Sequence, residues 1–71
     1  MMKRFSKKLR TLRERHGLSY RQLAAELGYS HAHLIGLEND THKPSAEFIL
    51  KLAHYFNVTT DQLLEDEQDV D

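Results

Sequence analysis

Three adjacent residues, Ser19, Tyr20 and Arg21, combine two hydroxyl groups and a guanidinium at a point where a helix is expected to begin. Ser19 is a favoured N-cap residue, and Gln22 three positions later completes a capping box. The free N–H groups and the dipole of a helix N-terminus favour an anion. We therefore expect Ser19, Tyr20 and Arg21 to bind phosphate, although Tyr20 could equally serve in packing alone.

The stretch from Leu18 to Asn39 sets this helix start in a larger pattern of two short helices joined by a tight turn. Gly28 can adopt the left-handed conformation that ends a helix, and Ser30 is the N-cap of the second helix. The expected inward residues are Leu23, Ala24 and Leu27 in the first helix and Leu34 and Leu37 in the second. This is the helix-turn-helix pattern, whose second helix, here residues 30–39, enters the DNA major groove.

Helix geometry decides which side chains of residues 30–39 could meet a base pair. Leu34 and Leu37 point inward, so the residues on the opposite side point outward. These are Ser30, His31, Ala32, Ile35 and Gly36, with Asn39 at the helix end. His31 could donate to guanine N7 or O6, and Ala32 and Ile35 could contact a thymine methyl. Partial burial of Ile35 and plain solvent exposure of His31 remain open.

The rest of the chain predicts three more helices and no strand. Apolar spacing favours a helix over residues 5–16, one capped by Ser45, and a last short one capped by Thr60. Their expected inward residues are Phe5, Leu9, Leu12, Ala46, Ile49, Leu52, Ala53 and Phe56, with Val58 beneath and Asn57 closing the fourth helix. The sequence thus predicts an all-α bundle of five helices over residues 1–64, with a loose arm at 1–4.

The net charge of −1 conceals a strong asymmetry. Residues 65–71 contain five acidic residues and no base, and we expect this tail to be disordered. Residues 1–64 contain ten Lys and Arg against six Asp and Glu. Eight of the ten bases lie between residues 3 and 21, which is typical of a phosphate-binding surface but also of a solvated helix face.

Composition excludes several other classes of protein. There is no Cys for a disulfide or a cysteine zinc site, and the five His do not have metal-ligand spacing. His31 and His33 diverge on a helix, so they are not expected to bind one metal ion together. For His33 the expectation is contact with phosphate, and the alternative is solvent exposure. We find no catalytic motif, no cofactor motif and no small-molecule site, so an enzyme is not expected. No apolar run reaches 18 residues and no signal peptide is present, so we expect a cytoplasmic location.

The ordered set of positions resembles the XRE family, the Cro/repressor-type helix-turn-helix domains, over about sixty residues. The matching positions are Leu9, Arg10, Thr11, Leu12, Arg13, Leu18, Ser19, Leu23, Ala24, Leu34, Leu37, Glu38, Pro44, Ser45, Ile49, Leu52, Ala53, Phe56, Val58, Leu63 and Leu64. The resemblance implies a lambda-repressor-like fold. It also implies base reading at the positions of His31, Ala32 and Gly36, and phosphate contacts from Asn39 and Lys43.

The same resemblance implies a structural role for two charged residues. Arg13 and Glu38 match a partly buried ion pair between the first and third helices, which would fix the angle of the recognition helix; two independent surface charges are the alternative. Asp40 stands where the family usually has a left-handed Gly. Because the recognition helix lacks the family's usual Gln, Ser and Arg readers, part of any specificity could come from DNA shape.

Assembly into a homodimer is expected, because one domain of this size reads too few base pairs for a genome. Leu50, Tyr55 and Leu63 have no obvious inward role and are the candidate interface. The alternative is that they complete the core of a monomer. We expect palindromic DNA with half-sites about one helical turn apart.

The function that these observations favour is sequence-specific binding of double-stranded DNA by a transcriptional regulator, as a repressor or autoregulator. The alternative is a protein-interaction module with the same fold, for example an antitoxin-like protein that docks on a partner.

Overall fold

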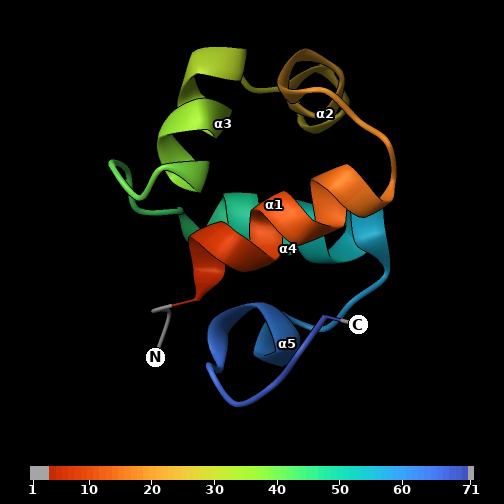
Figure 1. Cartoon of the computed structure of the whole chain (residues 1–71), viewed down its shortest axis with the longest axis vertical. Coiled ribbons are helices and arrows are strands. Elements are labelled where there is room, and N and C mark those ends of the chain that lie inside the picture. The colour runs from red at the N-terminus through yellow and green to blue at the C-terminus, as the bar shows by residue number, and fades with distance from the viewer. Residues whose placement is uncertain (1–3, 71) are drawn as a thin grey trace.

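The computed structural model describes residues 4–70, so three residues of the expected arm and the last residue of the tail lie outside it. Residues 4–70 form five helices and no strand, as expected. They are α1 (Phe5–Arg15), α2 (Tyr20–Leu27), α3 (His31–Glu38), α4 (Ala46–Phe56) and α5 (Thr60–Leu64). In Figure 1, α2 and α3 lie at one end of the molecule, α1 and α4 cross its middle, and α5 lies at the other end.

Local capping chemistry sets most helix bounds where the sequence predicts them. Ser19 and Gln22 form the reciprocal capping box of α2, and Gly28 ends that helix with φ 80°. The hydroxyl groups of Ser30 and Ser45 accept from the backbone of the third residue of α3 and of α4. Because each cap satisfies an N–H that the helix leaves unpaired, these short helices begin at defined residues.

The predicted cap of α5 is wrong by one residue. Thr59, not Thr60, is the N-cap, since its Oγ1 accepts from Gln62 N at 3.0 Å. Gln62 Oε1 accepts in turn from Thr59 N at 2.9 Å. The reason is the side chain three positions later: Gln62 can complete a capping box with Thr59, whereas Leu63 could not do so with Thr60.

One apolar core joins all five helices. It consists of Phe5, Leu9, Leu12, Leu23, Ala24, Leu27, Leu34, Leu37, Phe48, Ile49, Leu52, Ala53, Phe56 and Leu63. Two expectations are corrected. Ala46 is exposed, because it opens α4 one turn before Ile49, which already lies at the edge of the core. Leu63 is 0% exposed, because it anchors α5 beneath α1 and α4, so it cannot also supply a dimer surface.

Residues 65–70 of the acidic tail lie against the start of α1. The Arg4 guanidinium donates to Asp66 O and, at 2.6 Å, to Asp69 Oδ1. Val70 packs against the core. The Arg4 guanidinium also holds the pKa of Asp69 below its ordinary value. Charge complementarity with Arg4, which composition alone does not locate, accounts for this contact, and the expected disorder of the tail stays a prediction.

Lys8 is one of the eight bases between residues 3 and 21, but its side chain is buried rather than available to solvent or to a phosphate. Its Nζ donates to Gln62 O at 2.6 Å and to Glu65 O, the carbonyls at the end of α5. The aliphatic stem covers the core while the ammonium satisfies carbonyls that α5 leaves unpaired. Lys8 is therefore a fixed part of the α1–α5 contact.

Candidate nucleic-acid interface

The turn between α2 and α3 holds the two helices in a fixed relation. Gly28 is left-handed, and the N–H of Tyr29 returns to Ala24 O at 2.9 Å. These bonds close the end of α2, and Ser30 then starts α3 at once. Consequently α3 begins at the end of the molecule farthest from α5, with its first residues at the surface (Figure 1).

The predicted ion pair between α1 and α3 is present. Arg13 Nε donates to Glu38 Oε2 at 2.6 Å, and a terminal guanidinium nitrogen donates to Oε1 at 3.2 Å. The Glu38 side chain is 0% exposed and that of Arg13 is 11% exposed, so these are not independent surface charges. The hydrogen bond to Glu38 raises the pKa of Arg13 despite the opposing effect of burial. The pair ties α3 to α1.

Arg13 also explains the position of Tyr20. The guanidinium lies 4.2 Å above the centre of the Tyr20 ring and donates to Leu18 O at 2.9 Å. Tyr20 is half-buried against the core. Packing therefore accounts for the Tyr20 ring, and its contact with phosphate stays a prediction.

The expected base-reading residues do not share one environment. Ser30 and Ala32 are exposed, and His31 and Ile35 are half-buried. Gly36 is buried, because His42 from the following loop covers it. Gly36 therefore cannot present its own surface to a base pair, and that expectation is corrected. Outward direction on a helix does not guarantee exposure when the next loop folds back over it.

His33 lies in a stack of rings that runs along α3. Its ring centre is 5.3 Å from that of Tyr29 and 5.5 Å from that of His42, with both pairs close to parallel. Phe48 of the core meets the rings of Tyr29 and His33 edge-on. The expected phosphate contact of His33 stays a prediction; the structure adds that its ring faces are packed.

Exposed polar groups flank α3 on both sides. Ser19 and Arg21 are exposed at the start of α2, and Asn39 and Lys43 are exposed after α3. Among residues 4–70, neither Arg21 nor Lys43 has an ion-pair partner. Asp40 adopts φ 61°, the left-handed conformation expected there. The expected phosphate contacts of Ser19, Arg21, Asn39 and Lys43 stay a prediction.

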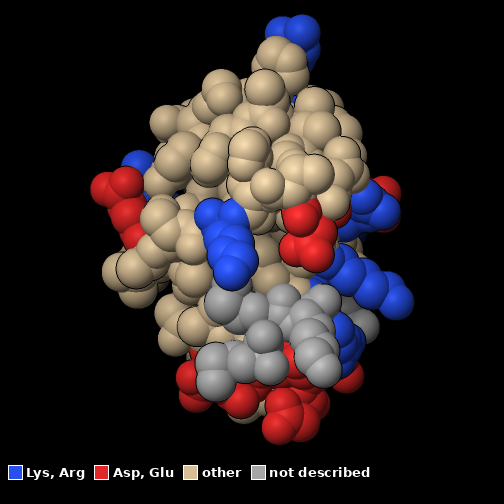
Figure 2. Space-filling view, turned by 90° about the vertical axis from the view of Figure 1, so that its left-hand side faces the viewer, with Lys and Arg blue, Asp and Glu red and all other residues tan. Residues whose placement is uncertain are grey.

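Many of the bases that produced the charge asymmetry are already engaged within the molecule. Arg4 pairs with Asp69, and Arg13 pairs with Glu38. Arg10 lies 3.4 Å from Glu38 and donates to Asn39 Oδ1 at 3.4 Å. Figure 2, which views the α3 side, shows acidic side chains gathered at the end where α5 and the tail lie, charged side chains of both signs across the middle, and a largely uncharged surface in the upper part. Base counts in the sequence therefore overstate the charge available to a partner.

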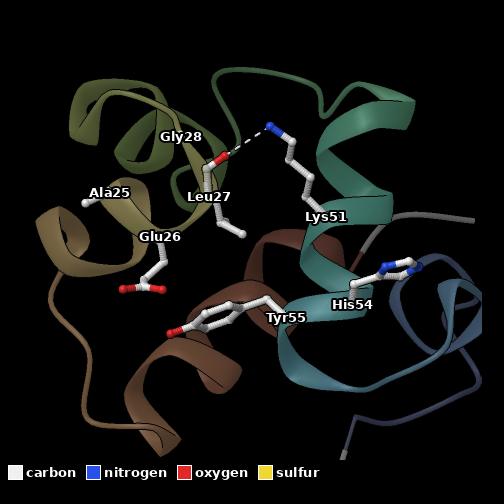
Figure 3. Close-up of a pocket in the computed structure, with 7 residues that line it drawn as sticks. All are labelled: Ala25, Glu26, Leu27, Gly28, Lys51, His54 and Tyr55. Atoms are coloured by element: carbon white, nitrogen blue, oxygen red, sulfur yellow. Dashed lines mark hydrogen bonds between the residues drawn. The ribbon is translucent and has the colours of Figure 1, made fainter.

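A shallow hollow lies between α2 and α4, on a different part of the surface. It is lined by Ala25, Glu26, Leu27, Gly28, Lys51, His54 and Tyr55 (Figure 3). Lys51 Nζ donates to Leu27 O at 3.3 Å across it. Tyr55 and Leu50 are the large apolar side chains of residues 4–70 that remain exposed. Of the three residues expected at an interface, these two are available and Leu63 is not.

Two other kinds of site are not found in the part of the chain that the structure describes. None of its helices is long and apolar enough to cross a membrane. No group of three or more His, Asp or Glu side chains is placed to hold a metal ion.

The capped helices α2 and α3 are joined by a tight turn, α3 is tied to α1 by the Arg13–Glu38 pair, and the first residues of α3 lie at the surface. This arrangement defines a helix-turn-helix domain. Comparison with known proteins gives the same result: a helix-turn-helix family model of the XRE type matches residues 9–63. The chain belongs to this family, and the resemblance seen in the sequence is confirmed.

Relatives of the chain are named as regulators. It is 33% identical over 58 residues to the HTH-type transcriptional regulator ImmR of Bacillus subtilis (strain 168), a match covering 82% of this chain. The chain spans only 46% of that relative.

Solved structures of relatives have the same fold. The restriction-modification controller protein C.AhdI from Aeromonas hydrophila is 33% identical with TM-score 0.77, covering 84% of this chain and 91% of its own. A transcriptional regulator from Listeria innocua is 30% identical with TM-score 0.82, covering 93% and 62%.

Proposed function

We propose that the chain is a sequence-specific DNA-binding regulator of transcription, acting as a repressor or autoregulator, with α3 in the major groove. The observation that carries the proposal is the joint fixing of α3 by the Gly28 turn and the buried Arg13–Glu38 pair. A helix held this rigidly at one end of the molecule suits the major groove, which admits one α-helix. The names of the relatives as regulators support the same function.

Contacts with the phosphate backbone would come from both sides of α3. Ser19 and Arg21 lie at the N-terminus of α2, where the helix dipole favours an anion, and Tyr20 could add its hydroxyl. Asn39 and Lys43 lie beyond the other end of α3. His31, Ala32 and Ile35 would then face base edges, with Ser30 at the helix start. In this arrangement the phosphate contacts position the domain on the duplex, and side chains of α3 make the base contacts that give sequence specificity.

The proposal includes pairing of two copies on a palindromic site. Leu50 and Tyr55 are the large apolar side chains exposed on α4, and each is available to a second copy. Two-fold symmetry would double the number of base pairs read. The expected cytoplasmic location belongs to this proposal as well.

Selection of bound sequences from a pool of random duplexes tests the function, with affinity for the recovered duplex then measured at several salt concentrations. A common sequence should emerge, and log K should fall by about 0.9 per phosphate contact for each unit of log salt concentration. Recovery of no common sequence and a flat salt response would reject DNA binding and favour the protein-docking, antitoxin-like alternative.

A further inference from the structure

The outward side of α3 carries a side chain that does not belong to α3. A Cβ added at Gly36 would lie 2.1 Å from Cδ2 and 2.7 Å from Nε2 of His42. These distances are far too short for any side chain, so the His42 ring occupies the space that a residue-36 side chain would need. Gly36 is thus the position on α3 that admits the ring, and His42 itself is exposed.

Backbone bonds anchor the loop that carries His42. Gly36 O accepts from the N–H of Thr41 at 2.9 Å and of His42 at 3.3 Å, and from Thr41 Oγ1 at 3.1 Å. Asp40, with φ 61°, reverses the chain so that these groups return over the helix. Gly36 therefore positions this loop in two ways. Its carbonyl binds the loop backbone, and its lack of a side chain leaves room for the His42 ring.

The ring of His42 is also held from the side. It stacks on His33 at 5.5 Å, and His33 stacks on Tyr29, while both of these meet the core residue Phe48 edge-on. The imidazole therefore has a packed position against α3 before any partner arrives. A group already ordered loses little conformational entropy when it binds.

We propose that His42 is a specificity-determining residue that reads a base edge in place of the side chain that Gly36 lacks. The inference rests on the proposed DNA-binding function. On this side of α3 the exposed neighbour one turn earlier, Ala32, offers only a methyl group. An imidazole can donate to guanine N7 or O6, or accept from an exocyclic amino group. The ring lies on the helix surface itself, which favours a base edge over the more distant backbone.

Four single variants separate reading from packing in the random-duplex selection. His42→Ala should lose preference at one or two base pairs, by about 10–100-fold in relative affinity, and keep it elsewhere. His42→Phe retains a ring over Gly36 but has no hydrogen-bonding nitrogen, so it should lose the same preference. Gly36→Ala retains His42, but the added methyl group displaces its ring from α3, so this variant should lose the same base-pair preference. The control Gln68→Ala, in the tail after α5 and outside both α3 and α4, should select the wild-type sequence.

The double variant Gly36→Ala/His42→Ala guards against misfolding, because the added methyl has room once the ring is removed. It should fold by circular dichroism and show the same lost preference. Retention of the wild-type preference by His42→Ala or His42→Phe would overturn the proposal. So would an equal loss of affinity for all sequences with a salt slope shallower by about one, which marks a phosphate contact. If the wild-type chain selects no sequence, the proposed function itself fails, and this inference with it.

Discussion

The Arg13–Glu38 pair gives the sharpest prediction of stability. Replacing Arg13 by Met keeps an unbranched apolar stem but removes the guanidinium, and so leaves the Glu38 carboxylate, which is 0% exposed, without its 2.6 Å donor. Breaking a buried pair on one side costs about 3–5 kcal/mol, because the remaining charge stays buried. For a domain of this length that shifts the melting temperature by about 12 °C or more. Urea unfolding followed by circular dichroism at pH 7 measures the loss.

The matched control is Arg10→Met, the same change in the second guanidinium near the same carboxylate. Arg10 is 46% exposed and lies 3.4 Å from Glu38, so its loss should cost about 0–1 kcal/mol. The double variant Arg13→Met/Glu38→Leu removes both buried charges and should recover at least half of the loss. If Arg13→Met costs no more than Arg10→Met, the pair does not hold α3 as argued.

Three other perturbations have defined outcomes. Arg21→Ala should weaken binding to all duplexes alike and make the salt slope shallower by about one, measured by titration at several salt concentrations. The Arg4 guanidinium lowers the pKa of Asp69, so ionised Asp69 favours the docked tail at pH values above its ordinary pKa of about 3.9. This contribution disappears as the pH falls through the lowered pKa of Asp69 in the folded protein. Asp69→Asn should abolish that acid step in an NMR titration. Asp40→Gly should stabilise the domain by up to about 1 kcal/mol in urea unfolding, because φ 61° strains a side chain with a Cβ.

Features set by neighbours in the sequence were predictable. The caps at Ser19, Ser30 and Ser45, the left-handed Gly28 and the end of α4 at Asn57 follow from residues within one turn of each helix end. Such signals are local, since a cap bonds to a group three positions away. The five-helix fold was therefore within reach of sequence reasoning.

Features set by residues distant in the sequence were not predictable in the same way. Lysine is usually found at the surface, yet Lys8 is buried, because its Nζ donates to the carbonyls at the end of α5. Gly36 faces outward by helix geometry, yet the loop at Thr41 and His42 covers it. Leu63 could complete a core or an interface, and only the packing of α5 under α1 and α4 decides. In each case a long-range contact overrides a correct local pattern.

The internal use of bases bears directly on how such a domain can bind DNA. Nonspecific affinity comes from neutralised phosphates, and Arg4, Lys8 and Arg13 are committed to Asp69, the end of α5 and Glu38. One copy should therefore bind random DNA weakly, with a shallow salt dependence. Strong binding then needs base contacts from α3 together with a second copy, which doubles both base and phosphate contacts. A Tyr55→Asp variant should accordingly lose far more affinity for a palindrome than for a single half-site, and equal losses on the two duplexes would contradict pairing through α4.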